Sequence, residues 1–241
     1  MVQENTKEGY ALKVRVKFAK EGAMKFIGHL DIMRYFQKAV KRANLDVAFS
    51  EGFSPHMIMS FASPLGVGIT STGEYFDMEL KSATTSSDMV KRLNDAMAEG
   101  MKILSIRQVE DGKASKAMSL VAAADYRLKF RETAKLPENW KEKLEEFKAQ
   151  KEIVILKKTK KSEKEIDIKP WIYELKLTDE GLFMKVAQGS ASNLKPDLVV
   201  SSLFNYLQKD IPSLITYQRE EMYCMVDDKL VPLDEIGETI E

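Results

Sequence analysis

The chain contains two histidines, His29 and His56, and both lie in its first quarter. Imidazole titrates near neutral pH, so these residues are the natural candidates for proton transfer or ligand contact. The acidic residues considered with them are Glu51, Glu74 and Asp77. Glu74 and Asp77 are three apart, so in a strand they face opposite sides and only one is expected to join the histidines. Histidine and carboxylate together can hold a divalent metal, but this spacing matches no metal motif, and we predict neither a metal nor a cofactor.

The first histidine stands at the start of an expected helix, in the sequence GHLD at residues 28–31. The free N–H groups of a helix N-terminus attract anions, and a phosphate bound there would also meet Arg34 and Lys38. Asp31 has another explanation, because an acid in the first turn complements the helix dipole and pairs with a basic residue three positions on. Ligand contact by His29, Asp31 and Arg34 remains open beside simple capping and pairing.

A loop with the sequence SEGFSPH, at residues 50–56, contains the second histidine. Its glycine permits a positive φ, and its proline holds the preceding serine in extended geometry, so the loop is expected to have a fixed irregular shape. Phe53 is either a plug in the core or an exposed platform on which a base stacks. His56 is either a hydrogen-bonded structural residue or a ligand contact, and Glu51 is kept with it as a candidate.

The N-terminal half has the strand and helix patterns of one α+β unit. Apolar residues alternate with Lys13, Arg15 and Lys17 over residues 12–18, which predicts a strand with one buried and one basic face. Apolar residues at helical spacing follow over residues 30–43. The remaining expected elements are strands at 57–61 and 74–80, a helix with apolar positions from 89 to 97, and a strand at 101–109. This βαββαβ order is that of a ferredoxin-like domain.

The C-terminal half repeats this order of elements without a sequence repeat. Its expected strands are 126–130, 153–156, 171–177, 182–187 and 215–226, with one helix led by Pro137 and another opened by Pro196. We therefore predict an α+β fold of tandem ferredoxin-like units with antiparallel sheets. The predicted division is a flexible N-terminal tail at 1–11, domains at 12–110 and 125–226, a linker at 111–124 and an acidic C-terminal tail at 227–241.

The composition, with 241 residues of which 44% are hydrophobic and 31% charged, is that of an ordinary globular protein. There is no apolar run near the roughly 20 residues of a membrane helix and no apolar signal segment, so we expect a cytoplasmic protein without membrane contact. The single cysteine, Cys224, is expected to be buried and cannot found a zinc site or an iron–sulfur cluster. The net charge is zero, yet nine Lys or Arg and two acids lie between Lys13 and Arg42, which predicts a basic face.

Several motifs carry a resemblance to a known family. They are GHLD with Arg34, SEGFSPH, LGV at 65–67, GEY at 73–75 with Asp77 and, more faintly, EIDIKP at 165–170, NLKPD at 193–197, and Arg219 with Tyr223. On these motifs the chain resembles the radical-SAM-linked proteins, a bacterial family of unknown function. The resemblance implies an accessory protein that acts with a cobalamin-binding radical-SAM enzyme, often encoded near genes of ribosome and RNA metabolism. Because the EIDIKP segment belongs to it, we expect Asp167 and Lys169 to face the cleft between the two units.

The resulting prediction is an auxiliary module that binds RNA and presents it to a radical-SAM partner, with binding favoured over catalysis. Its candidate ligand-binding residues are His29, Asp31, Arg34, Glu51, Phe53, His56, Glu74, Asp77 and Lys169. One alternative is a metal-independent RNA-processing enzyme, in which His29 or His56 is the general base and Lys25 or Arg34 stabilises the phosphorane. A second alternative is a protein-interaction subunit that binds no RNA. The sequence has no P-loop, dinucleotide fingerprint or serine-hydrolase elbow to support another class of chemistry.

Overall fold

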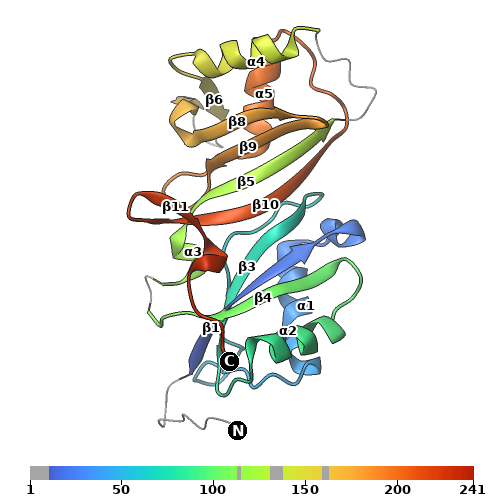
Figure 1. Ribbon diagram of the computed structural model, residues 1–241, viewed down its shortest axis with the longest axis vertical. Coiled ribbons are helices and arrows are strands. Elements are labelled where there is room, and N and C mark those ends of the chain that lie inside the picture. Colours follow the sequence, from blue (N-terminus) through green and yellow to red (C-terminus); the bar gives the residue numbers. More distant parts are fainter. Residues whose placement is uncertain (1–10, 113–114, 131–137, 159–162) are drawn as a thin grey trace.

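The computed structural model describes residues 11–112, 115–130, 138–158 and 163–241, and it shows an α+β protein built on one large, mostly antiparallel sheet. The sheet runs along the long axis of the molecule, with helices packed against its lower and upper parts (Figure 1). A separate two-stranded sheet lies near the upper end. In the described part of the chain, no helix is long and apolar enough to cross a membrane.

The N-terminal half supplies one end of the sheet and the two helices that cover it. Its elements are β1 (Leu12–Lys20), the 3-10 turn η1 (Gly22–Phe26), α1 (His29–Arg42), β2 (Met59–Phe61), β3 (Thr70–Leu80), α2 (Ser86–Asp95) and β4 (Met101–Gln108). The strands lie in the order β4-β1-β3-β2, and every pair is antiparallel. Alternate residues of β1, such as Val14 and Val16, pack against Phe36 and Val40 of α1. The alternation in β1 and the helical spacing in α1 therefore build the first core.

The C-terminal half supplies the other end of the sheet. Its elements are α3 (Ala117–Leu120), β5 (Val121–Phe130), α4 (Trp140–Ala149), β6 (Val154–Lys158), β7 (Glu163–Asp167), η2 (Lys169–Trp171), β8 (Ile172–Thr178), β9 (Gly181–Ala187), α5 (Pro196–Tyr206), β10 (Ile215–Val226), β11 (Lys229–Pro232) and η3 (Leu233–Glu235). The order β10-β5-β9-β8 is again antiparallel throughout. The strand expected at 153–156 is β6, which pairs with β7 in the separate sheet.

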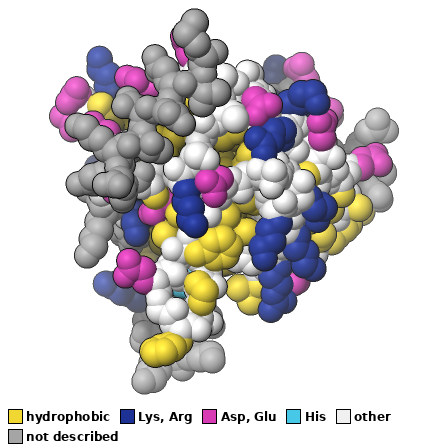
Figure 2. Space-filling model, turned by 90° about the horizontal axis from the view of Figure 1, so that it is seen from below, with side chains coloured by type: hydrophobic (Ala, Val, Ile, Leu, Met, Phe, Trp, Pro, Cys, Tyr) yellow, Lys and Arg dark blue, Asp and Glu magenta, His cyan; other side chains and the backbone are white. Residues whose placement is uncertain are grey.

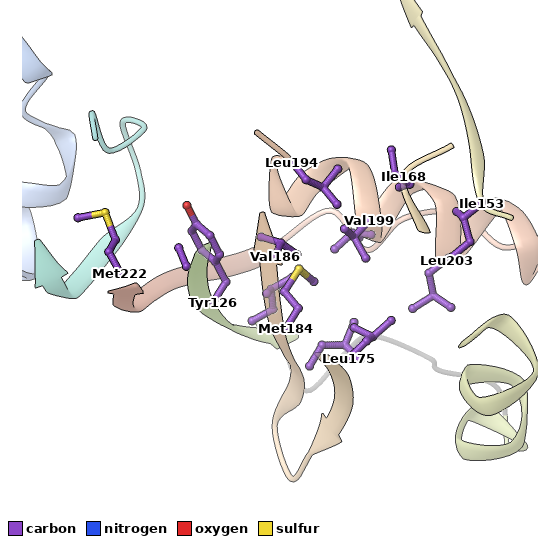
Figure 3. Close-up of a cluster of buried hydrophobic side chains, with 14 of the residues drawn as sticks. Tyr126, Ile153, Ile168, Leu175, Met184, Val186, Leu194, Val199, Leu203 and Met222 are labelled. Atoms are coloured by element: carbon purple, nitrogen blue, oxygen red, sulfur yellow. The ribbon is translucent and has the colours of Figure 1, made fainter. Parts of the chain in front are cut away.

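A second buried cluster fills the C-terminal half. Figure 3 shows Leu175, Met184 and Val186 of the sheet gathered with Val199 and Leu203 of α5. These residues alternate along β8 and β9 and recur at helical spacing in α5, which is the pattern of a sheet face covered by a helix. The structure thus has two core clusters, one under each pair of helices, while the predicted domain boundaries stay a prediction.

The two halves share one sheet because β3 pairs with β10, the sheet's one parallel contact. Gln218 lies opposite Thr70 and Arg219 opposite Ser71, at the start of β3. Gly73 lies at this joint, and a Cβ there would meet the backbone of Glu220 and Glu221. The absence of a side chain at position 73 therefore allows β10 to approach β3 closely.

The basic face predicted for the first strand is wrong, because this face is covered. Arg15 is buried against Asp77, and Lys13 is also buried. Lys17 pairs with Glu221, 2.7 Å away, and lies 3.8 Å from Asp234. The pattern of alternation was read correctly, but it could not reveal that acids from distant segments lie over the polar side of the strand.

The C-terminal segment, residues 227–241, folds back over the molecule. Its strand β11 pairs with β10, and Leu233 is buried in the second cluster. Further on, Glu238 forms a bridge with Gln108, and the carbonyl of Ile240 accepts a hydrogen bond from the Ser86 N–H. The segment predicted as an acidic tail therefore ties the two halves together. The segment predicted as a linker contains α3 and the first residues of β5, and the predicted tail at 1–11 lies almost entirely outside the described residues.

Candidate functional site

His29 is the first residue of α1, directly after the N-cap Gly28. Its ring is half-buried and meets the ring of Phe61 edge-on, with the centroids 5.5 Å apart. Together with Lys20 and Glu74 it lines a cavity of about 10 Å³. A space of this size holds at most one water molecule. The cavity has no room for a nucleotide as it stands.

The charges around this cavity set the state of its imidazole. Burial lowers the pKa of His29, the carboxylate of Glu74 opposes this, and the ammonium of Lys20 adds to it. Burial also lowers the pKa of Lys20, whose Nζ donates to the carbonyl of Ile27 at 2.8 Å. The neutral imidazole is therefore favoured over a wider pH range than in an exposed histidine.

Glu74 is bound on both of its oxygens by Arg219 of β10. The guanidinium donates from Nε at 2.7 Å and from Nη2 at 2.5 Å, and Nη2 also donates to the Ser63 carbonyl at 2.9 Å. Glu74 is 4% exposed and Arg219 is 1% exposed. Burial alone would lower the pKa of Arg219, but Glu74 and Tyr126 raise this pKa by more than burial lowers it. The guanidinium therefore stays charged. This bidentate pair crosses the joint between the two halves.

Asp77 lies on the opposite side of β3 from Glu74, as the spacing predicted. Its carboxylate accepts from Arg15 at 2.9 and 3.3 Å. It also accepts from the backbone N–H of Ala117, the first residue of the short helix α3, at 2.7 Å. Asp77 therefore fastens the connection between the halves to the sheet and does not join either histidine.

The SEGFSPH loop is closed by contacts between its two ends. Ser50 Oγ lies 2.8 Å from His56 Nδ1 and accepts from the His56 N–H at 3.1 Å. The Ser50 N–H in turn donates to the His56 carbonyl at 2.8 Å. Phe53 is fully exposed, so its interpretation as a core plug is wrong, and Glu51 is exposed as well.

The two histidines lie toward opposite ends of β3, which answers a question that the sequence left open, whether they share a pocket. The loop leaves the sheet after Val47, which pairs with Leu80. His29 instead lines its cavity with Glu74. Glu74 and Leu80 are six residues apart in one strand, which corresponds to roughly 20 Å. His56 and Glu51 therefore do not converge with His29.

Asp31 and Arg34 form an exposed ion pair, in which Asp31 Oδ1 and Arg34 Nη1 are 3.2 Å apart. The side chain of Asp31 is 66% exposed and that of Arg34 is 72% exposed. This is the i,i+3 pairing that was the alternative to ligand contact. Exposed pairs of this kind contribute about 0–1 kcal/mol, so the pair leaves Arg34 accessible to another anion.

Lys169 lies far along the C-terminal half, and its expected position in a cleft between the units is wrong. Its Nζ donates to the carbonyls of Lys148 and Gln150, at the end of α4. Its backbone N–H and that of Ile153 both donate to Asp167 Oδ1, at 2.9 and 2.8 Å. The residue lines a cavity of about 330 Å³ beside β8.

Sequence reasoning kept Arg219 out of the candidate site and overlooked Lys20. Both are buried charged residues of strands, Arg219 within β10 beside Glu74 and Lys20 at the end of β1 beside His29. The available signal was a charged residue inside a strand that is otherwise half-apolar, as in residues 215–226. Among the residues that the structure describes, no group of three or more His, Cys, Asp or Glu is placed to hold a metal ion, and Cys224 is buried.

These features define an α+β protein in which the motif residues join two halves of one sheet and leave an exposed loop and helix on the N-terminal half. Residues 13–196 match the family DUF2344, described as an uncharacterized protein conserved in bacteria, and the chain belongs to this family. No curated protein matches the chain. Since the family description names no activity, the link to radical-SAM enzymes stays a prediction.

Proposed function

We propose that the protein is an auxiliary cytoplasmic module that binds single-stranded RNA through α1 and presents it to a radical-SAM partner enzyme. The observation that carries the proposal is the solvent face of α1. Arg34, Lys38, Lys41 and Arg42 are all exposed there, and Asp31 is the one acid among them. Viewed from below, the N-terminal half presents a band of Lys and Arg side chains beside hydrophobic ones (Figure 2).

The helical period places these cations in a row. Residues 34, 38 and 41 follow at spacings of four and three, so their side chains lie above one another on one face. At 1.5 Å per residue they extend over roughly 10 Å of helix. A row of this kind can follow the phosphates of an extended strand, which is how sequence-tolerant RNA binders obtain most of their affinity.

Phe53 supports the RNA proposal from another element. It is fully exposed at the tip of the SEGFSPH loop, so it has no packing role that would explain an aromatic side chain. Exposed aromatic rings stack on unpaired bases, and each such contact contributes about 1–3 kcal/mol. Phe53→Ala is therefore expected to weaken RNA binding about fivefold or more and to leave the unfolding midpoint unchanged.

The fold also suits this class of function. With the β6–β7 hairpin set aside, both halves have the element order and strand order of a ferredoxin-like unit, which supports the tandem arrangement. Ferredoxin-like sheets often bind RNA on their open face, but here the polar side of β1 is covered. We therefore assign RNA to the helix and not to the sheet.

The radical-SAM partner is proposed from the motif resemblance. Radical-SAM chemistry needs several thiolates for its cluster, and this chain has one cysteine, which is buried. Any cluster would belong to the partner. The alternative of a histidine-based RNA-processing enzyme has less support, because the cavity at His29 is too small for a ribose and Glu74 is fully engaged. Intact RNA after incubation with the protein in chelator would count against the enzyme.

The test compares two charge-matched variants in fluorescence anisotropy with a labelled single-stranded RNA. One carries Arg34→Gln, Lys38→Gln and Lys41→Gln, and the control carries Lys141→Gln, Lys195→Gln and Lys209→Gln, three exposed lysines of the C-terminal half. Three phosphate contacts predict that affinity falls roughly 20-fold between about 50 and 200 mM salt. The α1 variant should lose this salt dependence while the control keeps it. Equal affinities of the two variants, or wild-type affinity indifferent to salt, would refute the proposal.

A further inference from the structure

A second cavity lies at the opposite end of the molecule from α1 and has no part in the RNA proposal. It has a volume of about 330 Å³, at the lower end of the range for ligand sites. Its walls are Phe147 and Lys148 of α4, Ile153, Lys169 and the first four residues of β8, Ile172–Leu175. Figure 1 places β8, β6 and α4 together at the upper end.

The lining shows that the cavity runs beside a strand edge. Successive side chains of a strand point to opposite faces, so a cavity over one face is lined by alternate residues. Here four consecutive residues of β8 contribute. In the described part of the chain, β8 ends the sheet and has β9 as its strand neighbour. Backbone groups on its outer edge are therefore available to an added strand.

The wall of the cavity is held in place by a single carboxylate. Asp167 Oδ1 accepts from the backbone N–H groups of Ile153 and Lys169 and so fixes both residues. Lys169 Nζ donates to two carbonyls at the end of α4. An ammonium has three donors, so one N–H of Lys169 remains for another acceptor. Phe147, Ile153 and Leu175 contribute apolar side chains to the wall, and the charged residues Lys148 and Glu174 line it as well, Glu174 paired with Lys176 at 2.7 Å.

We propose that this cavity binds the C-terminus of a partner protein, which adds to β8 as an antiparallel strand. The cavity lies at the N-terminal end of β8, and an antiparallel neighbour ends where β8 begins. The added strand pairs along residues 174–178, its last side chain enters the apolar wall, and its carboxylate accepts from Lys169. Strand addition with a pocket for a side chain is a recurring mode of peptide recognition.

The irregularity of β8 fits this arrangement. The register between β8 and β9 shifts between Ile172 and Glu174, so the ladder is irregular beside the cavity, although Ile172 still pairs with Val186. Tyr173 at the shift is 47% exposed and lines the cavity. A bulge re-aims a side chain, which agrees with the position of Tyr173 at the cavity.

The experiment uses a random heptapeptide library that is displayed with free C-termini. Peptides that bind the immobilised full chain are selected from it. Selected peptides are expected to share an apolar last residue, and each is then made as a free acid and as an amide. The acid should bind at least about tenfold more tightly than the amide, since a charge-assisted hydrogen bond is lost on amidation. No enrichment over an empty support, or equal binding of acid and amide, would overturn the proposal.

Variants then assign the carboxylate contact. Lys169→Gln keeps a donor for the α4 carbonyls and should weaken the acid about tenfold while leaving the affinity of the amide unchanged. Lys195→Gln, with the same change of charge on an exposed residue outside the cavity, should change neither. If Lys169→Gln weakens both peptides equally, the lysine has a structural role and the proposed contact is wrong.

Discussion

The bidentate pair between Glu74 and Arg219 gives the sharpest test of how the two halves are held together. Arg219→Met leaves the carboxylate of Glu74, 4% exposed, without its partner. Glu74→Met likewise leaves the guanidinium of Arg219, 1% exposed, without its partner. Removing one partner of a buried pair costs about 3–5 kcal/mol, because a charge stays buried and unpaired. Each single variant should therefore lose a large share of a total stability of about 5–15 kcal/mol.

The double variant separates this cost from the net contribution of the pair. With both residues changed to methionine, no charge is left buried, and apolar replacement of a buried pair is often close to neutral. The Ser63 carbonyl loses its donor, which costs about 1–3 kcal/mol. The two single changes sum to about 6–10 kcal/mol. The double variant should therefore recover at least roughly 3 kcal/mol relative to that sum, and it should be more stable than either single variant.

These differences are measured by urea unfolding followed by circular dichroism. The slope of the unfolding free energy against urea concentration must be the same for all variants. The exposed pair Asp31–Arg34 is the matched control, and its cycle should give a coupling below about 1 kcal/mol. Additive losses at Glu74 and Arg219 would show that the two charges do not depend on one another. The account of the joint as a buried ion pair would then be wrong.

Three further predictions concern single positions. Gly73→Ala should destabilise the protein by about 1–3 kcal/mol or more in thermal unfolding, because its Cβ would lie 2.6 Å from Glu221 Cα; an unchanged midpoint would contradict the close approach of the strands. Since burial lowers the pKa of His29 from 6.5, the unfolded chain takes up the proton first, and stability should fall as the pH drops below about 6.5. His29→Gln should remove part of this loss, and an unchanged pH dependence in this variant would contradict the role of His29. Burial raises the pKa of the Cys224 thiol, so Ellman's reagent should react with it at the rate of unfolding, and rapid reaction in the folded state would refute its burial.

Periodicity predicted the elements of this fold well because it is a local property. The helix expected at 30–43 is α1, His29–Arg42, and the strand expected at 12–18 is part of β1, Leu12–Lys20. In both, apolar residues recur with the spacing of one buried face. The strand expected at 153–156 is β6, but its place in a separate two-stranded sheet with β7 was not predicted, because a short apolar run does not indicate which sheet it joins.

What lies over each face was outside the reach of such patterns. Lys17 looked solvent-exposed, yet its partner Glu221 is more than 200 residues further along the chain. Asp77 looked like a ligand residue, yet it is bound by Arg15 from the neighbouring strand. The parallel contact of β3 with β10 brings Glu221 close to Lys17, and nothing local in either strand indicates this contact.

The same contacts support the proposal of binding over catalysis. A residue that performs chemistry needs free hydrogen-bonding capacity, and both oxygens of Glu74 and the Nδ1 of His56 are already engaged within the chain. On α1, in contrast, Lys38 and Lys41 are exposed, and in the described part of the structure neither has an acidic partner within ion-pair distance. Phe53 likewise has an aromatic face without an internal contact to explain it. The residues left with unused capacity are cations and an aromatic ring, which suit a nucleic acid strand better than a reacting bond.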